Sequence, residues 1–400
     1  MQQLTELKHY LVITFSYWAF TITDGAIRML VVLYFHQLGY SPLEIALLFL
    51  FYEFFGIVTN LVGGWIGSRI GLNKTMHIGM ALQILALMSL TVPTQWLSVA
   101  YVMAAQALSG IAKDLNKMSA KASVKLMLPS QSDASENERK LFKWVAILTG
   151  SKNTLKGAGY FIGGLLLAVA EFQGALYILA GGLTLVLALS FVMLPHEIGK
   201  SKAKTRFSQL FSRSREINWL SAARFFLFGS RDVWFVVALP VFLSSSLGWS
   251  HTQTGTFLAL WIIGYGFVQS SSPALLRKTN ANGMTAIVWT FLLALVPAAI
   301  AVALDAFENP EWVLMIGLAF FGIVFAVNSA LHSYLILSYS DHDKVAVNVG
   351  FYYMANAGGR LVGTVLSGWA FQQLGLTGCL WISAAFVVAA GLFSLPLRSR

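Results

Sequence analysis

The chain has 400 residues, of which 57% are hydrophobic and only 11% charged, a composition outside that of water-soluble globular domains. Its single cysteine, Cys379, excludes a disulfide framework and a cysteine-based metal site, and no cofactor or metal is expected. The net charge of +10 does not by itself indicate nucleic-acid binding, because the positions of the charges matter more than their sum.

Long apolar segments recur along the whole chain, separated by glycine, proline and clusters of charge. Each is long enough for the roughly 20 residues that a helix needs to cross a bilayer. The first follows MQQLTELKHY without a small-residue cleavage site, so we read it as a retained span and not a signal peptide. The pattern predicts an all-α polytopic membrane protein with twelve transmembrane helices over 10–37, 42–66, 75–93, 97–122, 143–170, 174–194, 218–245, 251–272, 283–303, 310–336, 345–371 and 376–396.

The basic residues between these spans indicate how the chain is oriented. The loops on the side of the two termini carry all the loop lysines and arginines, from Lys8 to Arg400. The alternate loops carry none, and they hold acids such as Glu171, Asp305 and Glu308. Because basic loops stay in the cytoplasm, we expect a multi-pass protein of a bacterial inner membrane with both termini cytoplasmic.

The chain also shows an internal repeat around a polar centre. Leu38-Gly39-Tyr40 is echoed by Leu247-Gly248-Trp249, and KGAGYFIGG (156–164) aligns with RLVGTVLSG (360–368). We therefore expect two six-helix bundles, 1–195 and 218–400, joined by a basic cytoplasmic linker over 196–217.

Charged residues inside the spans are the unusual feature of this chain. The spans hold nine basic residues and four acids: Arg28, Lys113, Lys117, Lys121, Lys152, Lys156, Arg224, Arg231 and Arg360 against Asp24, Glu53, Asp114 and Asp232. Helical spacing pairs Asp24 with Arg28 and Asp114 with Lys117, whereas Asp232 directly follows Arg231 and is not expected to face it.

Intramembrane charge is costly, at about 2.5 to 3.5 kcal/mol per residue even on the lenient insertion scale. A static ion-pair network accounts for only part of the nine cations, so we expect a multiply charged anion that enters from the cytoplasm to neutralise others. Lys113, Lys156 and Arg360 lie near the midplane and are expected to lack acidic partners in the empty protein. Lys117, Lys152, Arg28 and Arg231 complete the expected cationic lining.

Neutral polar residues in the spans extend the candidate site. Asn116, Tyr352 and Asn356 are candidates for hydrogen bonds to the anion, although helix–helix hydrogen bonding explains each of them equally well. Asp24, Glu53, Asp114, Asp232 and His332 are candidates for proton transfer or ion-pair coupling.

The loop after the second span reads GGWIGSRIGLNKT (63–75). It resembles the cytoplasmic signature of the major facilitator superfamily at Gly64, Arg69 and Gly71, which the resemblance assigns to a gating loop. Ser68 stands where that family usually has aspartate, which puts the usual charge relay in doubt. The resemblance implies the major facilitator fold of two six-helix halves and alternating access.

Several longer runs resemble the ArsJ-type organoarsenical efflux permeases within this superfamily. They include YWAFTITDGAIRMLVVLYFHQLGY, GIAKDLNKMSAK, KWVAILTGSKNTLKG and SRDVWFVVALPVFLSSSLGW. The resemblance implies export of 1-arseno-3-phosphoglycerate, which glyceraldehyde-3-phosphate dehydrogenase makes when arsenate replaces phosphate, and hence arsenate resistance. That dehydrogenase would be the functional partner, beside the lipid bilayer, and a monomer is expected.

Two other classes of protein share parts of this pattern. A sugar-phosphate or carboxylate carrier of the same fold would need the same excess of cations. A membrane-embedded enzyme would need a nucleophile with a base or a metal cluster, and His332 has no neighbouring acid in its span. The sequence therefore predicts a transporter and leaves the energy source open between proton antiport and uniport.

Overall fold

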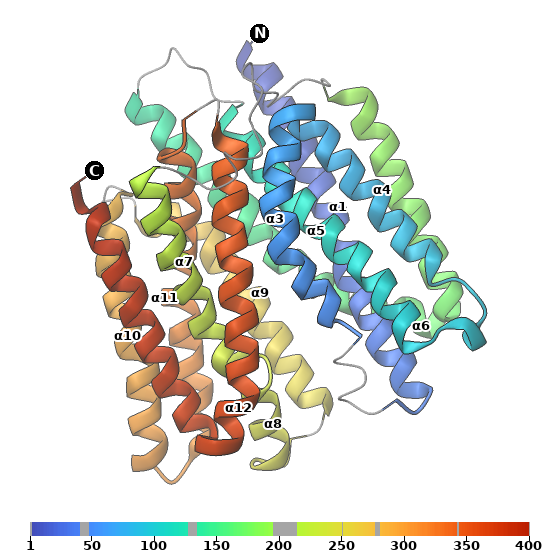
Figure 1. The fold of residues 1–400 in the computed structure, drawn as a ribbon. Coiled ribbons are helices and arrows are strands. Elements are labelled where there is room, and N and C mark those ends of the chain that lie inside the picture. The colour runs from blue at the N-terminus through green and yellow to red at the C-terminus, as the bar shows by residue number, and fades with distance from the viewer. Residues whose placement is uncertain are drawn as a thin grey trace. The chain divides into compact units, whose positions relative to one another are not determined.

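The computed structural model describes residues 2–40, 48–126, 134–194, 214–249, 251–276, 281–341 and 344–399. This part of the chain is helical and contains no strand (Figure 1). Its α-helices are α1 (Gln2–Gln37), α3 (Leu50–Ile70), α4 (Leu72–Ser89), α5 (Val99–Leu126), α6 (Ala134–Met193), α7 (Arg215–Phe235), α8 (Ala238–Ser245), α9 (His251–Leu275), α10 (Gly283–Ala306), α11 (Pro310–Ser338) and α12 (Val345–Ser394), with short 3-10 turns at Thr94–Trp96 and Leu395–Ser399.

The helices follow the predicted spans closely. Helices α6 and α12, of 60 and 50 residues, each bend at one non-helical residue, Glu171 and Gly375, and so each supplies two consecutive spans. The span predicted over 218–245 is interrupted between α7 and α8. Most of the predicted linker, 196–213, lies outside the described residues.

Several helices have the length and surface of membrane-spanning segments. Six helical segments of the described chain are long and apolar enough to cross a membrane: Leu7–Phe35, Leu50–Ile70, Glu136–Met193, Gly283–Ala306, Pro310–Ser338 and Val345–Leu397. Large apolar side chains stay exposed on their outer faces, among them Val192, Val169 and Ile316 at 87%, 70% and 67%. Long helices with exposed apolar faces of this kind are typical of segments that contact lipid.

The chain forms two compact units, each with its own core. The first comprises Met1–Asn137, Ser151–Phe211 and Ser340–Met354, and the second Glu138–Gly150, Ser212–Tyr339 and Ala355–Arg400. In the second unit Trp234 packs edge-on against Phe321, with ring centroids 5.0 Å apart. The bundle boundaries at 195 and 218 remain a prediction.

Paired glycines show the internal duplication at the level of backbone packing. A Cβ atom on Gly25 would lie 2.6 Å from the Lys156 carbonyl and 3.2 Å from Gly159 Cα, and one on Gly363 would lie 2.6 Å from the Gly229 carbonyl. At both crossings, α1 with α6 and α7 with α12, the backbones therefore approach so closely that only glycine fits. Both partners are displaced by the same 204 residues (229 − 25 and 363 − 159), as in the alignment of 156–164 with 360–368.

Candidate functional site

The first group of buried charges forms where α1 meets α6. The glycine crossing brings Lys156, three residues before Gly159, next to Asp24, the residue before Gly25. Lys156 Nζ lies 3.3 Å from Asp24 Oδ2, and the hydroxyl of Tyr52 on α3 donates a hydrogen bond to Asp24 Oδ1. The aspartate side chain is only 3% exposed, so this cation and this hydroxyl take the place of water.

Glu53 and Asp114 extend this group across α1, α3 and α5. Arg28 Nη2 lies 2.9 Å from Glu53 Oε1, and Lys113 Nζ lies 3.7 Å from both Glu53 Oε2 and Asp114 Oδ2. Lys117 Nζ contacts Asp114 Oδ1 at 2.5 Å, which confirms the predicted i,i+3 pair. Glu53 and Asp114 are thus each shared between two cations. We call Asp24, Arg28, Glu53, Lys113, Asp114, Lys117 and Lys156 the amino-terminal cluster.

Aromatic rings complete the environment of these cations. The Arg28 guanidinium lies 4.1 Å and the Lys113 ammonium 3.9 Å from the centroid of the Tyr52 ring. One turn from Lys117, Lys121 donates a hydrogen bond to the hydroxyl of Tyr353. Sequence reasoning missed Tyr52 and the role of Tyr353. The available signal was the position of Tyr52 beside Glu53, inside an otherwise apolar span.

The second group lies on α7 and α12 and is built around one aspartate. Asp232 is fully buried, with Arg231 Nη2 2.5 Å from its Oδ1 and Arg360 Nε 3.0 Å from its Oδ2. Arg224, which is 2% exposed, donates to Asn356 Oδ1 at 2.9 Å and lies 3.7 Å from the centroid of the Phe228 ring. We call Arg224, Arg231, Asp232, Asn356 and Arg360 the carboxyl-terminal cluster.

These contacts correct three expectations. Lys113, Lys156 and Arg360 were expected to lack acidic partners, and each has at least one carboxylate within 4 Å. Asp24 pairs with Lys156 on another helix, whereas Arg28 turns to Glu53. Arg231 does reach Asp232, because a long arginine side chain can fold back to its chain neighbour although the two Cβ atoms point apart.

Exposure separates the two signs of charge within the clusters. The side chains of Asp24, Asp114 and Asp232 are 3%, 1% and 0% exposed. The cations that contact them, Lys113, Lys117, Lys156, Arg231 and Arg360, retain between 12% and 31%. These carboxylates therefore lie behind their cations and hold them in position, and the accessible side of each pair is positive. Only Glu53, at 30%, is a partly exposed acid of the clusters.

The remaining candidates have diverse surroundings. Asn116 is fully buried and donates to the carbonyls of Met76 and Ala112, both at 3.4 Å, so it joins α5 to α4. Tyr352 is buried beside Tyr353, and Lys152 is half-buried one turn before Lys156. His332 is fully buried, and neither ring nitrogen has a hydrogen-bond partner in the part of the chain that the structure describes.

The predicted gating loop forms a tight connection between α3 and α4. Gly71 has φ 98° and ψ 149°, a conformation that other residues rarely adopt. Ser68 is buried and donates to the Trp65 carbonyl at 2.8 Å, and the Arg69 guanidinium lies 4.5 Å from the Trp65 ring centroid. A Cβ on Gly64 would lie 2.6 Å from the Ala346 carbonyl, so this close contact between backbones needs glycine.

Comparison with known proteins identifies the family. The family model described as the Major Facilitator Superfamily matches residues 13–302. The chain belongs to the major facilitator superfamily. No curated protein matches it in sequence.

Several solved structures share the fold of this protein. A bacterial homologue of the iron transporter ferroportin, in an outward-facing state, superposes with a TM-score of 0.75 at 14% identity, covering 99% of this chain and 100% of that one. The proton:xylose symporter XylE gives 0.77 at 14%, covering 98% and 96%, and the human organic anion transporter MFSD10 gives 0.74 at 15%, covering 98% and 99%. Sequence identities this low show a shared fold and do not indicate a shared substrate.

The family and the fold together fix the general activity. The protein is a multi-pass membrane transporter rather than an enzyme, as the sequence predicted.

Proposed function

We propose that this transporter exports a small, multiply charged organic anion, most specifically 1-arseno-3-phosphoglycerate, and so confers resistance to arsenate. The observation that carries the proposal is the arrangement of charge in the two clusters. Buried carboxylates hold lysines and arginines whose accessible sides are positive. Nine intramembrane cations against four acids leave an excess of five (9 − 4) that an anionic cargo can neutralise.

The chemistry of the cations suits a cargo with phosphate-like groups. Arg231 contacts Asp232 Oδ1 through Nε and Nη2, and Arg360 contacts Asp232 Oδ2 through Nε. Two guanidinium groups side by side suit phosphate-like oxygens, because arginine binds such groups with paired hydrogen bonds. Lys113 and Lys117 supply compact ammonium groups, which suit a second, separate negative group on a small molecule. The resemblance of several runs to the organoarsenical efflux permeases selects the arsenate ester among such anions.

The alternative is a sugar-phosphate or carboxylate carrier of the same fold, since those anions meet the same charges. The arsenate resistance of a sensitive bacterial host that expresses this protein distinguishes the two proposals. An exporter of 1-arseno-3-phosphoglycerate protects only when glyceraldehyde-3-phosphate dehydrogenase is co-expressed, and it leaves arsenite resistance unchanged. Protection without the dehydrogenase, or equal protection against arsenite, would exclude this substrate.

Site variants test whether the clusters bind the cargo. Arg360→Gln removes an accessible cation while Asp232 keeps Arg231 as its partner, so the protein should fold and lose resistance. Losing one charge-assisted contact weakens anion binding by about 1.5 to 3 kcal/mol, roughly ten- to a hundredfold. Lys344→Gln is the matched control, because Lys344 is 70% exposed outside both clusters. Full resistance in Arg360→Gln would remove Arg360 from the proposed site.

The remaining parts of the proposal concern setting and mechanism. We place the protein in a bacterial inner membrane, as a monomer, with both termini cytoplasmic and alternating access as the transport cycle. Buried His332 and the acids of the clusters remain the candidates for proton coupling. Measuring uptake of the anion into inverted membrane vesicles, with and without a proton gradient, would distinguish antiport from uniport.

A further inference from the structure

The bend of α6 is strained in a way that its duplicate in α12 is not. Glu171 has φ 58° and ψ −179°, and Gly375, displaced by the same 204 residues (375 − 171), has φ 66° and ψ −170°. This region of backbone space is essentially restricted to glycine. Among the described residues Glu171 is the one non-glycine residue with a positive φ. The turn thus keeps a carboxylate at a position where glycine is the unstrained choice.

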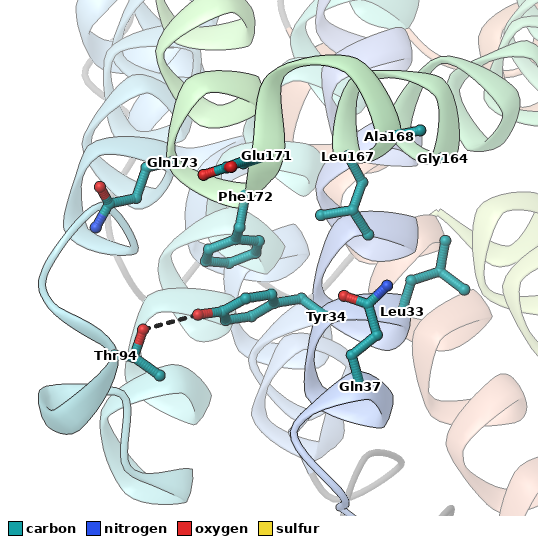
Figure 2. Close-up of a pocket in the computed structure, with 10 residues that line it drawn as sticks. All are labelled: Leu33, Tyr34, Gln37, Thr94, Gly164, Leu167, Ala168, Glu171, Phe172 and Gln173. Atoms are coloured by element: carbon teal, nitrogen blue, oxygen red, sulfur yellow. Dashed lines mark hydrogen bonds between the residues drawn. The ribbon is translucent and has the colours of Figure 1, made fainter.

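The strained turn borders a cavity of about 570 Å³ formed by α1, the segment before α5 and the bend of α6 (Figure 2). The rings of Tyr34 and Phe172 stack against each other in its lining, with centroids 4.0 Å apart and planes at 6°. The Tyr34 hydroxyl is held at 2.8 Å from Thr94 Oγ1. A volume of this size is in the range of small-molecule sites.

The charged group and most of the apolar groups lie at different ends of this cavity. Figure 2 shows Glu171, Gln173 and Thr94 toward one end, and Leu33, Leu167 and the amide of Gln37 toward the other. Gly164 and Ala168 lie on the same arm of α6 as Leu167 and add to the apolar end. Glu171 is the one charged side chain among the residues that line the cavity. The site therefore fits an amphiphile whose polar end carries a positive charge.

The place of the cavity along the helices matches the border between lipid and water. It lies where α1 ends, at Gln37, and where α6 reverses direction. Trp96, two residues after Thr94, leaves 64% of its side chain exposed, as do aromatic anchors at membrane interfaces.

From these observations we infer that this cavity binds an aminophospholipid, with its primary ammonium on Glu171 and its acyl chain along Leu33 and Leu167. At the same end as Glu171, Gln173 Nε2 donates one N–H to the Thr91 carbonyl at 3.1 Å and has a second N–H that can donate to the phosphate. A headgroup with only negative charge is disfavoured by the Glu171 carboxylate. The cavity shares no residue with either charge cluster, and the inference does not depend on which anion is transported.

Native mass spectrometry of the purified full-length protein tests the inference. Phosphatidylethanolamine, phosphatidylcholine and phosphatidylglycerol are each added to delipidated protein, and free ethanolamine is added in a separate arm. We expect phosphatidylethanolamine to bind at least about tenfold more tightly than the other two lipids, and Glu171→Gln to abolish this preference. Glu311→Gln, at an exposed acid in the first turn of α11, should leave it unchanged.

A second variant separates the ligand from the strain. Glu171→Gly should also lose the preference, and without added lipid it should melt at a higher temperature than the parent protein, because glycine relieves the turn. Retained selectivity in Glu171→Gln, equal binding of phosphatidylglycerol, or a lower melting temperature of Glu171→Gly would overturn the inference. Binding of free ethanolamine as tight as that of the lipid would show a site for soluble amines instead.

Discussion

Lys156→Gln and Arg360→Gln remove equivalent cations of the internal repeat, yet the structure predicts unequal losses of stability. Asp24, 3% exposed, has Lys156 as its ion-pair partner at 3.3 Å, with Tyr52 as its hydrogen-bond donor. Removing one partner of a buried pair costs about 3 to 5 kcal/mol. Asp232 keeps Arg231 at 2.5 Å when Arg360 is lost, and Arg360 is 31% exposed, so that loss should be about 1 kcal/mol.

The expected difference in the free energy of unfolding is therefore about 2 to 4 kcal/mol, with Lys156→Gln the less stable variant. Thermal unfolding in detergent ranks the variants, and unfolding in a graded detergent mixture gives the free energies. The double variant Asp24→Asn with Lys156→Gln should recover most of the loss, because a neutral amide can still accept the Tyr52 hydrogen bond. Equal stability of the two single variants, or no recovery in the double variant, would refute the reasoning.

Three further predictions concern packing, turns and orientation. Gly25→Ala should impair folding, because its Cβ would lie 2.6 Å from a backbone carbonyl. The control Gly181→Ala has open space around it and should be neutral or stabilising by up to about 1 kcal/mol. Melting curves of the two variants test this difference. Gly375→Ala should lower stability by about 1 to 3 kcal/mol in the same assay, since φ is 66° there, and an unchanged melting temperature would contradict the assigned turn. In intact cells an impermeant thiol reagent should label a cysteine placed at Asp305 and not one at Arg139; the reverse pattern would overturn the orientation, and buried Cys379 should give little background.

Local sequence rules predicted the features that depend on one segment at a time. Apolar runs of the right length predicted the helices, because a backbone in lipid must satisfy its own hydrogen bonds. The alignment of 156–164 with 360–368 predicted a duplication that now appears in the paired crossings Gly25–Gly159 and Gly229–Gly363. The Asp114–Lys117 pair followed from i,i+3 spacing on a single helix.

The partners of the other charges were decided only by the tertiary structure. Asp24 has Arg28 one turn away on its own helix, but the glycine crossing puts Lys156 within reach, and the guanidinium of Arg28 instead meets Glu53. The position of Tyr52 between Arg28 and Lys113 likewise depends on how α1, α3 and α5 cross. The sequence of any one of these helices does not show it. The sequence showed that nine cations and four acids fall within the predicted spans. The packing of the helices decided that three of those acids lie behind the cations, because a carboxylate can be buried only where a cation and hydrogen-bond donors replace its water.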